Sequence, residues 1–284
     1  MISFDYMITS GCNLNCPYCY GSQRTPELSL EQKIELIKGL SHIDNVHLII
    51  SGGEPLSSPD IINICSYAKE LGLKIALQTN GTHINKLEKL LPFIDWIGLP
   101  IDGISADICK KTRTMEEHFY FVKKSIEAIE YYKNKENSAT PYIKIGTVIT
   151  KYNFFELKNI CSFLKEHNIS IWKIYKIRRR GKMASDNLYK DICTSNEDLA
   201  QVSSIITKFH TNFPIYYSDQ SVNDSYIIIE PNSDVIVIKG NERINCGNLF
   251  PKSIFNLRSL QHALQIVNIE QIHKNINKSF PSWQ

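Results

Sequence analysis

Short apolar runs alternate with longer segments of helical period along the first two thirds of the chain. The expected strands lie at residues 2–8, 46–50, 74–79, 96–99, 142–149 and 171–177, and the expected helices lie at 30–40, 60–71, 117–132, 154–167 and 198–210. This alternation predicts an α/β fold with a parallel sheet and right-handed crossovers. Because six such units are two fewer than a closed eightfold barrel contains, we expect a curved, partly open (β/α)6 barrel. Chemistry in such folds lies at the carboxyl ends of the strands.

The pattern changes towards the end of the chain. Two runs rich in β-branched residues, 226–230 and 235–239, are joined by a Pro-Asn-Ser-Asp turn, which predicts a hairpin. A short helix is expected at 257–267. We therefore expect two parts, a partial barrel at 1–213 and a small C-terminal α+β cap at 214–284.

Composition and charge narrow the class of protein. The 284 residues are 43% hydrophobic and 21% charged, and the chain has neither a secretory signal nor a run of about eighteen apolar residues. We therefore expect a cytoplasmic protein that does not enter a membrane. The net charge of +3 does not favour nucleic-acid binding, but it suits a small anionic substrate. Because the cytoplasm keeps thiols reduced, metal binding explains a close group of cysteines better than disulfides do.

Three of the eight cysteines, Cys12, Cys16 and Cys19, lie within eight residues of one another. A loop that tight can present three thiolates to one inorganic cluster, as iron–sulfur ligation requires. Zinc also accepts thiolates, but a structural zinc site usually takes a fourth Cys or His from a second close pair. The other cysteines are scattered singly, at positions 65, 109, 161, 193 and 246. Three thiolates would leave one iron open to another ligand, which indicates a catalytic cluster.

The C-x3-C-x2-C spacing directly after the first expected strand, with the aromatic Tyr18 before the third cysteine, resembles the radical S-adenosylmethionine (SAM) superfamily. The resemblance implies that Cys12, Cys16 and Cys19 bind three irons of a [4Fe–4S] cluster and that the fourth iron binds SAM. An external donor of the flavodoxin or ferredoxin type would reduce the cluster, and SAM would be cleaved to methionine and a 5′-deoxyadenosyl radical. Tyr18 matches the aromatic position whose backbone lies near the adenine in this family.

Further motifs follow the next expected strands. Gly52, Gly53 and Glu54 belong to a Ser-Gly-Gly-Glu-Pro segment that resembles the family motif for the SAM amino group. Glycines allow a close backbone approach and a carboxylate suits an ammonium ion, although a simple turn is the alternative interpretation. Three more residues occupy positions that resemble SAM contacts in the family, and each also fits an ordinary turn or surface position: Asn80, Asp102 and Arg113.

Positive residues mark the last expected strands of the barrel. Lys144 and Lys173 interrupt apolar runs, and a lysine in such a place should have a partner or a ligand. Arg178 opens the run Arg-Arg-Arg-Gly-Lys after strand 171–177, where forked arginines could bind phosphate oxygens. A solvated surface run is the alternative interpretation.

Local matches around these lysines resemble viperin-like nucleotide dehydratases, which make 3′-deoxy-3′,4′-didehydro nucleotides. The resemblance places Lys144 and Lys173 near a triphosphate and suggests Tyr226 as a hydrogen donor. Trp283 is similar to a terminal tryptophan of those enzymes. The first strand departs from their Asn-x-His pattern because it carries Asp5 and Met7 there. An anionic Asp5 would be unfavourable beside a triphosphate without a cation between them.

Two other functions stay open. The segment 229–235 with a later Gly-Asn-Leu-Phe resembles the C-terminal hairpin of radical SAM peptide and cofactor maturases, but the cysteines for auxiliary clusters are missing. We expect no leader-binding domain before the barrel, because the first expected strand begins at residue 2. A noncatalytic iron–sulfur electron carrier is the remaining alternative, and the Gly-Gly-Glu-Pro motif speaks against it, since a carrier needs no SAM pocket.

Overall fold

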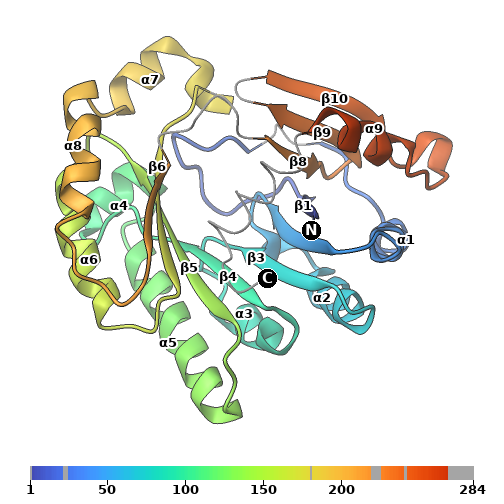
Figure 1. Cartoon of the computed structure of the whole chain (residues 1–284), viewed down its shortest axis with the longest axis horizontal. Helices are drawn as coiled ribbons and strands as arrows, with labels where there is room; N and C mark the ends of the chain where they lie inside the picture. Colours follow the sequence, from blue (N-terminus) through green and yellow to red (C-terminus); the bar gives the residue numbers. More distant parts are fainter. Residues whose placement is uncertain (1, 22–24, 180, 219–224, 240–241, 268–284) are drawn as a thin grey trace.

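The computed structural model describes residues 2–21, 25–179, 181–218, 225–239 and 242–267. Within these ranges it has one sheet in the order β10-β9-β8-β1-β2-β3-β4-β5-β6-β7, curved as Figure 1 shows. The strands are β1 (Ile2–Thr9), β2 (Val46–Gly52), β3 (Lys74–Gln78), β4 (Trp96–Pro100), β5 (Tyr142–Ile149), β6 (Ile171–Lys176), β7 (Ile215–Ser218), β8 (Ser225–Ile229), β9 (Asp234–Lys239) and β10 (Glu242–Asn248). Strands β1 to β7 pair in parallel. The predicted α/β partial barrel is confirmed.

Helices cover the outer side of the curved sheet (Figure 1). They are α1 (Leu30–Ser41), α2 (Ile61–Glu70), α3 (Ile84–Leu90), α4 (Ala106–Arg113), α5 (His118–Glu136), α6 (Leu157–Lys165), α7 (Asp186–Ile192), α8 (Asn196–Ile206) and α9 (Arg258–Ile266). The strands at β1 to β6 and the helices at α1, α2, α5, α6, α8 and α9 agree with the sequence-based expectations to within a few residues at each end. The expected helix 154–167 is shorter than predicted, because its first turn is a separate 3-10 segment at Phe154–Glu156.

Some elements were not predicted. Helix α4 is mostly polar and short, and α3 and α7 have seven residues each, so their periodicity is weak. Strand β7 has only four residues and pairs with β6 at the edge of the parallel part. Within the described ranges β7 therefore extends the parallel strands β1 to β6, where six strands were expected, and β8 adds a further parallel strand on the other side of β1.

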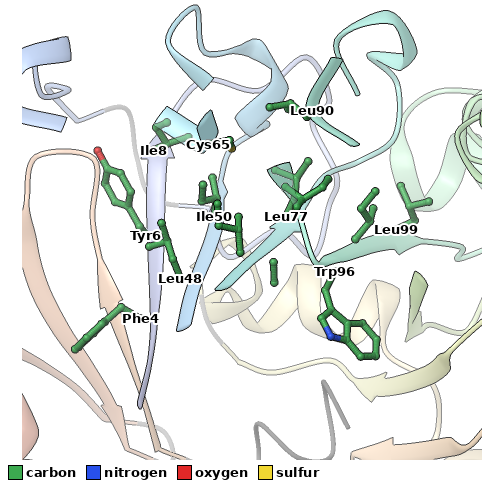
Figure 2. Packing of buried hydrophobic residues seen from close by; sticks show 14 of the residues in the cluster. Phe4, Tyr6, Ile8, Leu48, Ile50, Cys65, Leu77, Leu90, Trp96 and Leu99 are labelled. Atoms are coloured by element: carbon green, nitrogen blue, oxygen red, sulfur yellow. The ribbon is translucent and has the colours of Figure 1, made fainter. Parts of the chain in front are cut away.

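The two faces of the sheet differ in polarity, and this difference positions the site. Side chains that face the helices are almost completely buried and apolar (Figure 2); they include Phe4, Tyr6, Ile8, Leu48, Ile50, Leu77 and Leu99. Neighbouring positions on the same strands face the inside of the curve, because side chains alternate along a strand. There the chain carries Asp5, Ser51, Lys144 and Lys173. The hydrophobic effect thus forms the outer layer and leaves a polar interior.

The C-terminal part adds to the same sheet. Strand β8 lies parallel to β1, and β9 and β10 follow it as antiparallel neighbours, so the predicted hairpin is confirmed. The division at residue 213 stays a prediction, since β7 lies beyond it and pairs with the barrel. Among the described residues, no helix is both long and apolar enough to cross a membrane. Trp283 and Arg180 lie outside the described residues.

Candidate active site

The cysteine loop begins where β1 ends, at the carboxyl edge of the sheet. Cys12 and Cys19 are exposed, whereas Cys16 is 8% exposed. Each of the three sulfurs accepts at least one N–H hydrogen bond. The donors are Leu14 N and Asn80 Nδ2 to Cys12 at 3.4 and 3.9 Å, Arg113 Nη1 to Cys16 at 3.8 Å, and Gly21 N to Cys19 at 3.1 Å. Such donors stabilise negative charge on sulfur, so the loop fits a group that binds thiolates.

The charge state of the sulfurs depends on what they bind. Burial raises the pKa of the Cys12 and Cys16 thiols, and the Arg113 guanidinium opposes this rise at Cys16. A metal cluster removes the thiol protons through direct bonds, which reverses this tendency. The described residues contain no group of three or more His, Cys, Asp or Glu side chains arranged around a single metal ion. A cubane cluster does not require such convergence, because each thiolate binds a different iron.

Gly52 and Gly53 bring the turn after β2 into close contact with the start of the cysteine loop. Gly53 N donates to Thr9 O at 2.8 Å, and Glu54 N donates to Gly11 O at 2.8 Å. A Cβ atom on Gly53 would lie 2.1 Å from Gly11 O, and one on Gly52, whose φ is +141°, would lie 2.4 Å from Thr9 O. The glycines therefore allow the turn after β2 to pack on the start of the cysteine loop. Their close backbone approach is to that loop, and contact with SAM stays a prediction.

Glu54 is completely buried and joins three segments of the site. Its Oε1 accepts from Leu56 N at 2.9 Å and from Thr79 Oγ1 at 2.7 Å, and its Oε2 accepts from Asn80 N at 2.6 Å. Burial raises the pKa of the Glu54 carboxyl, and these hydrogen bonds oppose the rise. The carboxylate holds the ends of β2 and β3 together next to the cysteine loop. Binding of the SAM amino group by Glu54 stays a prediction.

Asn80 connects the cysteine loop to α5. Its Nδ2 donates to Asn13 Oδ1 at 2.8 Å, and its backbone oxygen accepts from His118 Nε2 at 3.0 Å. Burial, together with the charge of Arg113, lowers the pKa of His118 to about 3, so this histidine is neutral. Sequence reasoning missed His118, since a single histidine at the start of a helix carries no distinctive signal.

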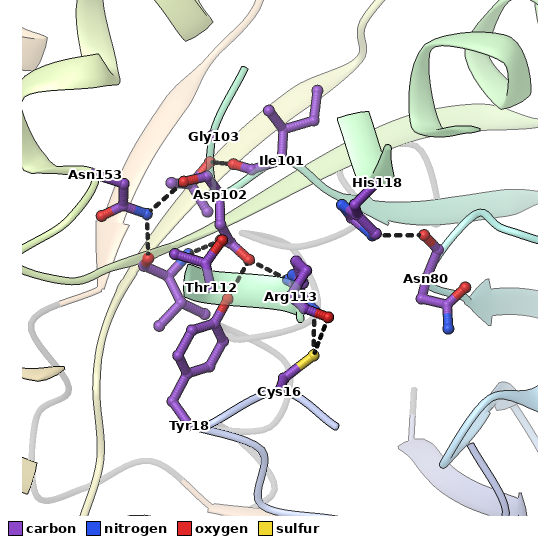
Figure 3. A network of polar contacts seen from close by, with 12 residues as sticks. Cys16, Tyr18, Asn80, Ile101, Asp102, Gly103, Thr112, Arg113, His118 and Asn153 are labelled. Carbon is purple, nitrogen blue, oxygen red and sulfur yellow. Dashed lines mark hydrogen bonds and ion pairs between the residues drawn. The ribbon is translucent and has the colours of Figure 1, made fainter. Parts of the chain in front are cut away.

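Asp102 is the centre of a buried polar network beside Cys16 (Figure 3). Its Oδ2 accepts from Tyr18 Oη at 2.5 Å and forms an ion pair with Arg113, and its Oδ1 accepts from Val148 N at 2.6 Å. The Asp102 side chain has no exposed surface and the Arg113 side chain is 14% exposed. Both carboxylate oxygens are thus engaged by the protein and position Tyr18 and Arg113, and direct contact of Asp102 with SAM stays a prediction.

Arg113 lies between Asp102 and the cysteine loop. Burial, the largest single effect, lowers the pKa of its guanidinium, but the negative charge of Asp102, together with Tyr18 and Cys16, raises the pKa above its usual value. Its guanidinium also lies 5.6 Å from the centre of the Tyr18 ring. Arg113 Nε is buried and has no hydrogen-bond partner among the described residues. A buried donor without a partner beside Cys16 fits an anionic acceptor at this place.

The inside of the barrel holds charges from opposite strands. The charges of Asp5 on β1 and Lys144 on β5 act on each other although three strands separate β1 from β5 in the sheet. Burial raises the pKa of Asp5 to about 6, against a hydrogen bond from Ser51 and the charge of Lys144. Burial and the charge of Lys173 lower the pKa of Lys144 to about 7, against the charge of Asp5. The structure therefore brings Lys144 and Lys173 together, as expected, and adds Asp5 to them.

A group of tyrosines lies near these charges. Lys173 Nζ lies 5.4 Å from the centre of the Tyr175 ring. Burial raises the pKa of Tyr175, and the groups whose charges act on its hydroxyl are Tyr20, Arg178 and Tyr226. The expected site residues Arg178 and Tyr226 are therefore close to Tyr175, although one follows β6 and the other belongs to β8.

The basic run after β6 does not act as a single cluster. Arg179 pairs with Asp186 and its guanidinium lies 4.3 Å from the centre of the Tyr189 ring. Lys182 Nζ donates to Asn15 Oδ1 at 2.5 Å and to Cys16 O at 3.1 Å. Arg179 and Lys182 are thus engaged by groups of the protein, and binding of the substrate by Arg178 stays a prediction.

A cavity of about 1040 Å³ opens at the other end of the strands. Trp96 and Tyr142, which begin β4 and β5, line it together with residues from the carboxyl end of α5. None of the expected site residues lines this cavity. Because chemistry in barrel folds belongs to the carboxyl ends of the strands, we place the active site at the cysteine loop.

The sequence matches the family "Radical SAM superfamily" over residues 6–164, which is more than half of the chain. The chain belongs to the radical SAM superfamily. Radical SAM enzymes use a [4Fe–4S] cluster and SAM, so the protein is an enzyme with these two cofactors. The donors around the three sulfurs and the unpartnered Arg113 Nε fit this cofactor pair.

Curated radical SAM relatives differ in their reactions. The chain is 29% identical to an AdoMet-dependent heme synthase of Methanosarcina barkeri over 62% of its length and 50% of that protein. It is 24% identical to an S-adenosylmethionine-dependent nucleotide dehydratase of Flammeovirga pacifica over 81% of its length and 80% of that protein. The chain thus spans half of the first relative and about four fifths of the second.

Solved radical SAM structures share the fold. Native anSMEcpe with bound AdoMet and Cp18Cys peptide superposes with a TM-score of 0.68 at 17% identity, covering 98% of this chain and 83% of that one. Streptococcus suis SuiB bound to S-adenosylmethionine superposes with a TM-score of 0.62 at 16% identity, covering 82% and 59%. At these identities the likeness supports the fold alone.

Proposed function

We propose that this radical SAM enzyme acts on a nucleotide and removes water from it, as the printed name of the nucleotide dehydratase relative describes. The observation that carries the proposal is the pair Lys144 and Lys173 inside the barrel, below the cysteine loop. The similarity to the Flammeovirga pacifica protein supports it, because that match covers about four fifths of both chains.

In this proposal Cys12, Cys16 and Cys19 hold the cluster. When bound, the cluster and SAM supply a 5′-deoxyadenosyl radical that abstracts a hydrogen atom from the substrate. Arg113 Nε is free to donate to an anionic group of SAM, while Asp102 keeps the guanidinium in place. Glu54 and Asn80 hold the loops that surround the cofactor, and the tightly packed Gly52 and Gly53 keep the turn against the cysteine loop.

Lys144, Lys173 and Arg178 bind the anionic part of the substrate in this proposal. Positive side chains bind phosphate through charge-assisted hydrogen bonds. Lys144 faces Asp5. The carboxylate of Asp5 therefore cancels part of the positive charge that Lys144, Lys173 and Arg178 bring to the interior. Tyr226 and Tyr175 lie near Arg178, and we propose Tyr226 as the hydrogen donor that ends the reaction. An external flavodoxin or ferredoxin supplies the electrons.

The test is anaerobic reconstitution with iron, sulfide, SAM and dithionite, followed by incubation with each nucleoside triphosphate. We expect 5′-deoxyadenosine together with a product that is lighter than one of the nucleotides by one water molecule, measured by liquid chromatography and mass spectrometry. Formation of 5′-deoxyadenosine without consumption of any nucleotide would contradict the nucleotide proposal and favour a peptide or cofactor substrate. Absence of 5′-deoxyadenosine under all conditions would contradict the proposed cluster and SAM site at Cys12, Cys16 and Cys19.

Replacing Lys144 or Lys173 with methionine should raise the KM for the nucleotide by about tenfold to a hundredfold, because one charge-assisted hydrogen bond contributes about 1.5–3 kcal/mol. Steady-state kinetics at saturating SAM measure this change. Lys158→Met is the matched control, since Lys158 is exposed on α6, away from the interior of the barrel. An unchanged KM in both interior variants would remove the phosphate-binding role.

Nucleotide binding should weaken as the pH rises from about 6 to about 8. Lys144 is charged below its pKa of about 7, and Asp5 becomes charged above its pKa of about 6. Both changes make the interior more negative as the pH rises, so an anion is bound less tightly. Between about pH 6 and about pH 8 the nucleotide affinity of the wild-type enzyme should fall about tenfold more than that of Lys144→Met, because the variant lacks the lysine.

Titration calorimetry with a nucleoside triphosphate at several pH values measures this dependence. Comparison with Lys144→Met at each pH removes the contribution of the phosphate groups' own titration. A wild-type affinity that rises with pH relative to the variant would show that Lys144 does not contact the anion.

A further inference from the structure

The short segment that follows β6 packs directly on the cysteine loop. The 3-10 turn η4 (Gly181–Ala184) begins at Gly181, whose φ is +54°. A Cβ atom at this position would lie 2.8 Å from Tyr20 Cα and 2.9 Å from Cys19 O. The two backbones therefore approach as closely as a glycine allows. This places η4 against the third cysteine.

Apolar packing strengthens the same contact. Met183 is completely buried in a small cluster with Tyr18, Ile177 and Ile192. The hydroxyl of Tyr18 is held by Asp102 on its other side. Tyr18, which lies between the second and third cysteines, is thus fixed both by η4 and by the carboxyl end of β4.

Lys182 adds a polar contact to the second cysteine. Its ammonium group donates to the backbone oxygen of Cys16 at 3.1 Å and to Asn15 Oδ1 at 2.5 Å. Cys16 therefore has a cation on each side, Lys182 at its carbonyl group and Arg113 at its sulfur. The two cations differ, because Asp102 balances the charge of Arg113, whereas no carboxylate among the described residues forms an ion pair with Lys182.

We propose that Lys182 is a positioning residue for the iron–sulfur cluster, which holds the Cys16 peptide in place and supplies a positive charge, not paired with a carboxylate among the described residues, that favours the reduced cluster. The inference rests on the proposed ligation of the cluster by Cys12, Cys16 and Cys19. Reduction adds negative charge to a cluster, and the reduction potential depends on nearby charge and on hydrogen bonds. A cation fixed at the backbone of one ligand therefore makes reduction easier.

The experiment compares Lys182→Met with the wild-type enzyme after the same anaerobic reconstitution. We expect a more negative midpoint potential in a redox titration followed by electron paramagnetic resonance. We also expect a severalfold faster loss of iron to a chelator, because the Cys16 peptide has lost its hydrogen bond. Lys182→Arg keeps the charge and a donor, so it should return both quantities most of the way to wild type.

Lys190→Met is the matched control, since Lys190 is exposed on α7 and lies close to η4 in sequence. It should leave the potential and the iron loss unchanged. A wild-type potential and wild-type iron loss in Lys182→Met would overturn the inference while leaving the cluster assignment intact. A failure of the proposed ligation by Cys12, Cys16 and Cys19 is distinct, because then the wild-type enzyme would not assemble the cluster, and a failure of the nucleotide proposal shows in substrate consumption and leaves both quantities unaffected. Circular dichroism of each variant confirms that the chain is folded.

Discussion

Replacing Cys16 with alanine should abolish the visible absorbance of the reconstituted cluster and all formation of 5′-deoxyadenosine. The variant would keep the thiolates of Cys12 and Cys19 and lose that of Cys16, which is buried and whose Sγ lies 3.8 Å from Arg113 Nη1. Cluster assembly depends on the ligand thiolates, so the loss of one removes the cofactor and the reaction with it. Iron and sulfide analysis together with absorbance spectroscopy measures the effect.

Cys193→Ala is the matched control for this variant. Cys193 is half-buried after α7 and lies outside the cysteine loop, so its removal should leave the iron content and SAM cleavage at wild-type values. Retention of the full iron content and of SAM cleavage in Cys16→Ala would refute the assignment of this cysteine as a ligand.

Replacing Asp102 with alanine should lower the free energy of unfolding by about 3–5 kcal/mol, the cost of breaking a buried ion pair by removal of one partner. Arg113 would keep its charge in a site where 14% of its side chain is exposed, and Tyr18 and Val148 would lose their acceptor. Denaturant unfolding of the protein before cluster reconstitution measures the change. The same loss should loosen Tyr18 and thereby the loop between Cys16 and Cys19.

Asp107→Ala provides the comparison. Asp107 forms an ion pair with Lys111 at 2.7 Å on the exposed side of α4, where the two side chains are 66% and 46% exposed. Exposed pairs contribute little, so this variant should unfold at the wild-type denaturant concentration within error. Equal stabilities of the Asp102 and Asp107 variants would show that the buried network does not stabilise the fold.

The order of strands and helices could be predicted because each strand from β1 to β6 has an apolar face that must be buried. Their alternation with amphipathic segments implied parallel pairing. The elements that were missed lack this signal. Helix α4 has only eight residues, most of them polar, and its start is stabilised by Ser105, whose hydroxyl accepts from Ile108 N at 3.4 Å. Strand β7 is too short to show the alternation of apolar and polar residues that predicts a strand. It joins the sheet through its backbone pairing with β6.

The positions of the three cysteines are a local property, so their spacing alone indicated a cluster. The partners of that loop are not local. Gly53 is predicted to contact SAM from its motif, and the structure adds that its missing side chain is needed for packing against Gly11, which the motif does not show. Asp102 and Arg113 are predicted separately as SAM contacts, and the structure adds that they form an ion pair with each other, which the sequence does not show. Sequence patterns do not contain the distances that decide between such alternatives.

The sequence by itself determined the fold class and the cysteine loop, because these depend on residue types and on spacings within short segments, and the resemblance of its motifs to the radical SAM superfamily implied the cofactors. Only the tertiary structure decided how the charges are combined. Asp5 meets Lys144 because β1 and β5 face each other across the curved sheet, and Lys182 meets Cys16 because η4 folds back on the first loop. Electrostatic and hydrogen-bond energies depend on the distance between two groups and on their burial. For residues more than a hundred positions apart in the sequence, only the folded structure determines that distance and that burial.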